Sequence, residues 1–232
     1  MELRTLPLVT GLLPIGAVIS AYLIAAYFGH VPSCVPLFDG CTTISSAGRD
    51  APESLLFRAT MIPTAMLLML YWRLAGEWLI RSGDPRTRAG RVMIWLGSIA
   101  AVFLIVYTVA LGFIGEHYAL QRRIGVTLFF AFTFLAQLLL VHRLGQLIQA
   151  TRQTTLQPAY RIKVSICVAM LALGLAVSPL KAIYPDHTFI ENIVEWNFAL
   201  LMYLFFVATS LAWRSTSFAA EFSVRFPDKR GE

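Results

Sequence analysis

The chain of 232 residues is 57% hydrophobic and only 14% charged, with a formal net charge of +6. Soluble domains carry about 25% charged residues, so this chain has too little polar surface to cover a globule that water surrounds. The composition excludes an ordinary soluble protein and indicates an integral membrane protein. We expect no nucleic-acid partner, because the distribution of the positive charge suits a membrane surface.

Six apolar segments follow one another along the chain. They cover residues 6–29, 54–78, 92–114, 124–147, 164–183 and 194–213. Each is long enough for a helix to cross a hydrocarbon core of about 30 Å, and none shows the alternation of a barrel strand. The sequence therefore predicts an all-α, polytopic membrane protein with six transmembrane helices, forming a single domain over residues 1–232.

The basic residues predict how the chain is oriented. Cytoplasmic loops of membrane proteins carry an excess of lysine and arginine. Most of the 19 lysines and arginines fall on one side of the membrane if the N-terminus is cytoplasmic. We therefore expect both termini to be cytoplasmic, and the longest outer connection is then the loop at about residues 30–53.

Most residues capable of acid–base chemistry collect on this predicted outer side. His30, His117 and His187 lie there, and Glu195 stands near the start of the last span. We expect no metal site, because the two Asp/Glu–His pairs are sequence neighbours, which do not point the same way on a helix. A serine nucleophile is an alternative, but no nucleophile-elbow glycine pattern surrounds the outer serines. No cofactor is expected.

Two features of the outer side leave alternatives open. Cys34 and Cys41 share the outer loop in an oxidising compartment, so they are candidates for a disulfide that closes a short loop. Arg58 lies one turn into the second span, where an ionisable residue is normally functional or paired. Its side chain can extend outward to the interface, pair with Glu195, or bind a lipid phosphate.

The stretch ISSAGRDAPESLLFR, residues 44–58, resembles the signature of the Frag1/DRAM/Sfk1 family. The matching positions are Ile44, Ser45, Gly48, Pro52, Glu53, Leu56 and Phe57. A second match is the pair Glu195 and Trp196 near the start of the last span. The sequence departs from the family pattern at Thr43, Ser46 and Ala51, and it has Arg122 where the family places a histidine before Gly125.

The resemblance implies that the protein handles membrane lipids, either phospholipids or glycolipids. The PGAP2-like and Cwh43-like branches of the family imply remodelling of GPI-type lipid anchors, by attachment or exchange of an acyl chain at the outer leaflet. The alternative is a non-catalytic protein that binds lipid or organises the membrane. We expect a prokaryotic cytoplasmic membrane, in which the substrate would be another outer-leaflet lipid, with the Golgi, endoplasmic reticulum or plasma membrane as alternatives.

Under the enzyme hypothesis, a polar outer residue would serve as general base, and His117, His187 and Glu195 are the candidates. The outer loop would form one wall of a lipid head-group pocket. Its candidate binding residues are Ser45, Arg49, Glu53, Arg58 and Trp196. The structural alternative is that the signature only folds the loop against the bundle, with Gly48 in a backbone conformation closed to other residues and Pro52 in the first turn of a helix.

Overall fold

The computed structural model describes residues 3–85, 87–184 and 188–219. Within these ranges the chain forms six long helices: α1 (Thr5–Tyr27), α4 (Glu53–Arg81), α5 (Arg88–Ala110), α6 (Glu116–Thr151), α7 (Gln157–Ile183) and α8 (Thr188–Ser215). All six are long and apolar enough to cross a membrane. The structure confirms the predicted all-α fold with six spans, and the protein is an integral membrane protein.

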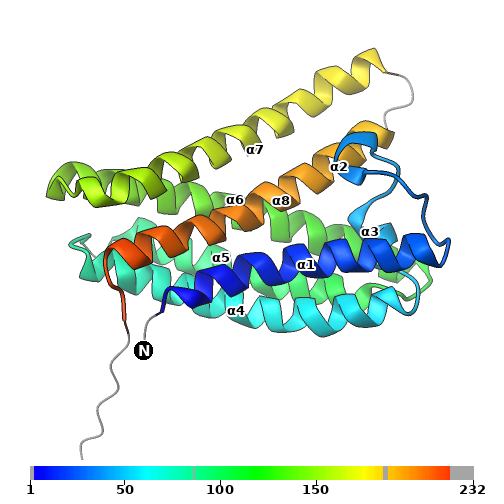
Figure 1. Ribbon diagram of the computed structural model, residues 1–232, viewed down its shortest axis with the longest axis horizontal. Coiled ribbons are helices and arrows are strands. Elements are labelled where there is room, and N and C mark those ends of the chain that lie inside the picture. Colours follow the sequence, from blue (N-terminus) through cyan, green and yellow to red (C-terminus); the bar gives the residue numbers. More distant parts are fainter. Residues whose placement is uncertain (1–2, 86, 185–187, 220–232) are drawn as a thin grey trace, which may run out of the picture.

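The helices lie alongside one another and give the bundle two distinct ends (Figure 1). One end carries residues 28–52, which connect α1 to α4 and contain two short helices, α2 (Pro36–Asp39) and α3 (Ile44–Ala47). We call it the loop end. At the opposite end, the tail end, α1 begins and α8 finishes, and the backbone N–H of Leu3 donates to the carbonyl of Phe218 at 3.2 Å. A 3-10 turn, η1 (Thr154–Leu156), connects α6 to α7 there.

Several helices extend beyond the apolar segments that predict them, and α6 does so most clearly. It begins at Glu116, so His117 and Arg122 lie on the helix and not in a connecting loop. A helix satisfies its own backbone hydrogen bonds and can continue into the polar interface without cost from unpaired groups. The Arg122 guanidinium donates to the carbonyls of Ala110 at 3.2 Å and Phe113 at 2.8 Å, and so ties α6 to the end of α5.

The tail half of the bundle is packed around aromatic side chains. Tyr71 of α4 lies edge-to-face against Phe206 of α8, with ring centroids 4.8 Å apart, and stacks on Trp213 at 5.9 Å. The neighbouring Trp72 lies flat against α5 at Gly97, where an added Cβ would come within 2.3 Å of the indole. Glycine is therefore required at that crossing, because any side chain would separate the two helices.

Buried polar contacts also connect the helices in the tail half. The Arg143 guanidinium of α6 donates to both carboxylate oxygens of Asp84, through Nε at 3.0 Å and through Nη2. Lys163 of α7 is completely buried, and its Nζ donates to Thr209 Oγ1 at 2.6 Å and to the Phe205 carbonyl at 3.1 Å. These contacts hold α6 and α7 against their neighbours at the tail end.

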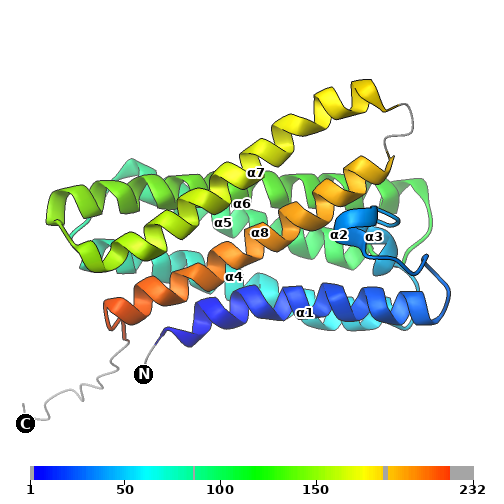
Figure 2. The same ribbon diagram turned by 45° about the horizontal axis from the view of Figure 1, so that its top comes forward.

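Helix α7 separates from the bundle toward the loop end. Its buried residues all lie in the first half of the helix: Ala159, Lys163, Ile166, Cys167 and Met170. Figures 1 and 2 both show its second half leaning away from the other helices. The space that this divergence leaves beside α6 and α8 is where the candidate site lies.

Candidate functional site

The loop of residues 28–52 is held against the bundle by the first turns of α8. Three side chains of α8 donate to main-chain carbonyls of the loop. These bonds are Asn192 Nδ2 to Gly40 at 2.7 Å, Trp196 Nε1 to Thr42 at 2.9 Å and Asn197 Nδ2 to Leu37 at 2.8 Å. Because their acceptors are backbone atoms, these bonds fix the path of the loop and do not depend on its side chains.

Helix α1 holds the same loop from its other side. The Tyr22 hydroxyl donates to the carbonyl of Cys34 at 2.7 Å and accepts from the Cys34 N–H at 2.8 Å. Cys34 forms a disulfide with Cys41, which closes the segment that contains α2. The Tyr22 ring lies edge-to-face on Trp196, with centroids 5.8 Å apart. The buried Trp196 therefore joins α1, α8 and the loop.

Glu195 lies beneath the short helix α3. Its carboxylate is hydrogen-bonded by the backbone N–H groups of Ile44 and Ser45, which have no partner within the helix. The Thr43 hydroxyl accepts from the N–H of Ser46 at 2.9 Å and so caps the same turn. The Ser45 hydroxyl is 2.9 Å from the Tyr107 hydroxyl of α5. Helix α3 is thus fixed between α8 and α5, with Glu195 and Ser45 side by side.

A cavity of about 430 Å³ lies next to this pair, between α6, α7 and α8. Its polar residues are Thr43, Ser45, Thr127, Glu191 and Glu195, and its apolar residues are Val126, Phe130, Val177, Val194 and Phe198. The lining of this cavity thus combines polar and apolar side chains at the loop end of the spans. This combination suits a molecule with a polar head and an apolar chain.

A second apolar space of about 300 Å³ lies on the opposite side of α8, against α1 and α2. Tyr22, Leu23, Pro36, Trp196 and Leu200 are among its lining residues. A gap of about 20 Å³ lies between the two spaces. It shares Val126, Phe130 and Glu195 with the cavity, and Val18, Ile44, Ala199 and Tyr203 with the second space. Glu195 therefore lines both the cavity and the gap that separates it from the second space.

Two signature residues have structural roles that differ in part from expectation. Gly48 has a φ of −110°, so the expected conformation closed to other residues is wrong. Glycine is needed for close approach, because an added Cβ would lie 2.9 Å from the Phe57 ring and 3.1 Å from Leu111. Pro52 was expected in the first turn of a helix, but it stands one position earlier, as the residue that immediately precedes α4 at Glu53.

The predicted site residues are not all brought together. Ser45 and Glu195 line the cavity and Trp196 lines the second space. Arg49 is exposed on the loop, and His117 is exposed on α6. His187 lies outside the described residues.

The contacts of Arg58 differ from the three alternatives given above, which were extension to the interface, pairing with Glu195 and binding of a lipid phosphate. Its Nη2 donates to the carbonyl of Leu111, and its guanidinium lies 4.8 Å from the centre of the Phe113 ring. Among the described residues, Arg58 and Glu195 do not form an ion pair. Arg58 instead ties α4 to the end of α5.

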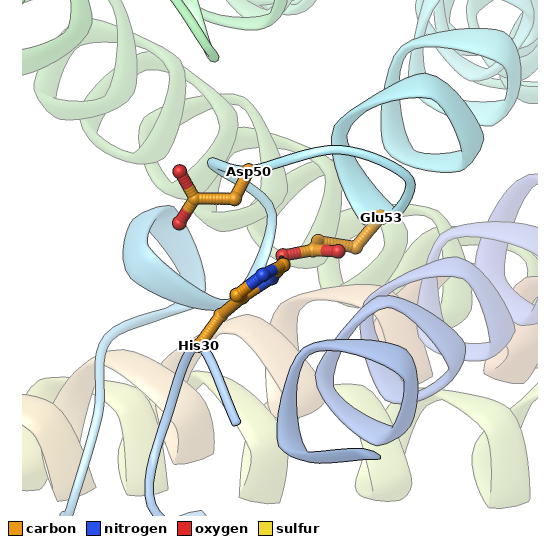
Figure 3. A group of neighbouring side chains, drawn as sticks. All are labelled: His30, Asp50 and Glu53. Atoms are coloured by element: carbon orange, nitrogen blue, oxygen red, sulfur yellow. Dashed lines mark hydrogen bonds and ion pairs between the residues drawn. The ribbon is translucent and has the colours of Figure 1, made fainter. Parts of the chain in front are cut away.

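One contact in the loop was missed by sequence reasoning. His30 Nδ1 lies 2.6 Å from Glu53 Oε1, and the Glu53 side chain is fully buried. Asp50 lies close to both (Figure 3). His30 and Glu53 are separated by a whole loop, so no local spacing reveals the pair, and the only signal was their shared place on the predicted outer side.

Comparison with known protein families identifies a match over most of the chain. A family model described as the Frag1/DRAM/Sfk1/Cwh43P N-terminal domain matches residues 2–215, a range that includes all six spanning helices. No curated protein and no solved structure matches the chain.

Proposed function

We propose a lipid-handling function for this chain, which belongs to the Frag1/DRAM/Sfk1/Cwh43P N-terminal domain family. In this proposal, one phospholipid or glycolipid molecule of the outer leaflet places an acyl chain in the cavity between α6, α7 and α8. Its head group lies at the loop end, beside Ser45 and Glu195.

The cavity is the observation that carries the proposal. Its volume of about 430 Å³ falls in the range of roughly 300–1,000 Å³ that is typical of small-molecule sites. An acyl chain gains little by leaving the equally apolar bilayer. Selection of a lipid must therefore come from the polar residues at one end of the cavity, of which Glu195 and Ser45 are positioned by hydrogen bonds to α3 and α5.

The proposed side of the membrane rests on charge. Arginines concentrate toward the tail end, at Arg73, Arg81, Arg88, Arg91 and Arg143. By the positive-inside rule the tail end is cytoplasmic and the loop end faces outward. The cavity then opens to lipids of the outer leaflet.

The lipid retained by the purified protein tests this proposal. Wild type, Glu195→Gln and Ser45→Ala are purified in mild detergent, and the lipid extracted from each is quantified by mass spectrometry. Glu116→Gln, an exposed acid at the same end of the bundle, is the control. We expect wild type and control to retain one lipid class in near-stoichiometric amount, and both site variants to lose that selectivity. Equal lipid content and composition in all four proteins would contradict the proposal.

Acyl transfer is a second candidate function, favoured by the place of Glu195 on both the cavity and the gap that separates it from the second space. Two lipids in those spaces would bring a hydroxyl and an acyl ester to the same carboxylate. Glu195 would take the proton of a lyso-lipid hydroxyl, and that oxygen would attack the acyl carbonyl of a donor phospholipid. The donor's ester C–O bond would break, and the proton would pass to the departing lyso-phospholipid oxygen. This exchange of one ester for another needs no cofactor.

A transfer assay separates this second function from binding alone. The reconstituted protein is given a lyso-lipid and a phospholipid with an isotope-labelled acyl chain, and products are followed by mass spectrometry. General acid–base catalysis contributes about 10²–10⁴-fold, so Glu195→Gln should lose at least about 100-fold. His117→Ala should keep its activity, because His117 is exposed and does not line the cavity. If the protein binds lipid but transfers no acyl chain from any donor, the acyl-transfer function is contradicted and the protein is a non-catalytic lipid-binding protein.

A further inference from the structure

Three side chains with metal-binding atoms meet at the loop end, away from the cavity. They are His30, which follows α1, Asp50, and Glu53, the first residue of α4. One potential ligand atom from each lies within 4.8 Å of the other two. Figure 3 shows the His30 imidazole next to the Glu53 carboxylate, with the Asp50 carboxylate turned to one side of this pair. The three residues come from the two ends of the loop, so the cluster exists only because the loop folds back.

Glu53 is the unusual member of this group. Its side chain has no exposed surface, and its Oε2 is buried without a hydrogen-bond partner. A buried carboxylate is costly unless a cation compensates it. Arg58, on the same helix, is engaged with Leu111 and Phe113. Within the described residues, His30 is the one ion-pair partner of Glu53.

We propose that His30, Asp50 and Glu53 bind a divalent transition-metal cation, with Zn²⁺ as the reference ion. One imidazole nitrogen and two carboxylate oxygens form a ligand set that zinc accepts. Imidazole favours Zn²⁺ and its neighbours over Mg²⁺ and Ca²⁺, which prefer oxygen ligands alone. The cation would compensate the buried charge of Glu53 and give its second oxygen a partner.

The surroundings allow a metal ion to enter and bind. The His30 side chain is 31% exposed and Asp50 is exposed, so the cluster is accessible from solvent while Glu53 closes it on the inner side. Three protein ligands leave coordination positions open to water or to an anionic group. The cation would also join the end of α1 to the start of α4.

The competing explanation is a His30–Glu53 ion pair with no metal, and Asp50 distinguishes the two. Among the described contacts, Asp50 makes no hydrogen bond to His30 or Glu53, yet it would be a metal ligand. Replacing Asp50 therefore weakens a metal site but leaves an ion pair intact. Replacing Glu53 is less informative, because the helix start itself could be disturbed.

The test uses the full-length protein in detergent, freed of metal with a chelator. Zn²⁺ binding is measured by titration calorimetry, the ligand field by the visible absorption of bound Co²⁺, and stabilisation by thermal unfolding. Wild type should bind one Zn²⁺ per chain and unfold at a higher temperature with it. Loss of a group that only supports a ligand costs about 10–100-fold in affinity, so Asp50→Asn should weaken binding at least 10-fold. His117→Ala, which alters an exposed histidine outside the cluster, should bind as wild type does.

Three results would overturn the metal site. The first is the absence of stoichiometric Zn²⁺ or Co²⁺ binding by chelator-treated wild type that still unfolds cooperatively. The second is equal affinity in wild type and Asp50→Asn, which would show that any bound ion lies elsewhere. A wild-type melting temperature unaffected by Zn²⁺, with binding equally weak in all three proteins, would identify the cluster as an ion pair only.

Discussion

The two ends of the bundle differ in the burial of the charged side chains that join α6 and α7 to their neighbours. At the tail end, Arg143 and Asp84 form a buried pair, and Lys163 is fully enclosed between α7 and α8. At the loop end, Lys181 of α7 pairs with Glu191 of α8, and their side chains are 35% and 48% exposed. Helix α7 is thus held firmly at one end and weakly at the other.

This difference explains why a cavity opens between α6, α7 and α8 at the loop end. The tail half of α7 carries all of its buried residues, so packing there fixes the position of the whole helix. Toward the loop end α7 diverges, and side chains of α6 and α8 that it would otherwise cover line an open space. The loop, held by α1 and α8, adds Thr43 and Ser45 to the polar residues that α6 and α8 already provide.

The largest loss of stability at the tail end is expected when one partner of its buried ion pair is removed. Arg143→Ala leaves the Asp84 carboxylate buried and uncompensated, and such losses cost about 3–5 kcal/mol. We expect a drop of that size in the free energy of unfolding, measured by denaturant titration in detergent. Arg123→Ala, an exposed arginine on the same helix, is the matched control and should change stability little. A similar change in the free energy of unfolding for both variants would show that this ion pair does not stabilise the tail end.

A smaller effect is expected where the loop meets α8. Trp196→Phe keeps an aromatic ring against Tyr22 but deletes the hydrogen bond to the Thr42 carbonyl, and a typical hydrogen bond contributes about 1 kcal/mol. The loop should open more often, seen as several-fold faster amide hydrogen exchange in residues 36–47. Trp95→Phe, at a ring that is 68% exposed, should leave this exchange unchanged. Unaltered exchange in Trp196→Phe would mean that other contacts suffice to hold the loop.

The smallest effect is expected at the exposed pair between α7 and α8. Surface ion pairs contribute about 0–1 kcal/mol, so Lys181→Ala should reduce the free energy of unfolding by no more than about 1 kcal/mol. Spin labels on α7 and α8 near the loop end should report a broader distance distribution, while labels near Lys163 should not. A destabilisation as large as that of Arg143→Ala would remove the distinction between the two ends.

The sequence predicted the spans well because a membrane restricts the choice. A continuous apolar segment must form a helix to satisfy its backbone groups, so hydropathy alone indicates six crossings. The helix ends were less predictable, as α6 shows, because hydropathy does not sense a helix that continues past the hydrocarbon. Residues of the two family motifs lie close together at the loop end, where Ser45 is beside Glu195 and Trp196 donates to the Thr42 carbonyl of the loop.

Other features depend on contacts between distant segments and left no local trace. Lys163 reads in the sequence as one more basic residue near a cytoplasmic connection, yet Thr209 and Phe205 enclose it. The pairing of His30 with Glu53 requires the loop to return to the bundle. The cavity depends on the direction of α7, which follows from where its packing residues stop and not from its composition.

The most direct test of the account is to fill the cavity and count the bound lipid. Val177 of α7 lines the cavity, whereas Leu171 of the same helix is 50% exposed and is not among its lining residues. Native mass spectrometry of protein released from lipid nanodiscs should show about one retained lipid per chain in wild type and in Leu171→Trp. Val177→Trp should retain at least 10-fold less. Equal retention in Val177→Trp and Leu171→Trp would contradict a lipid site between α6, α7 and α8.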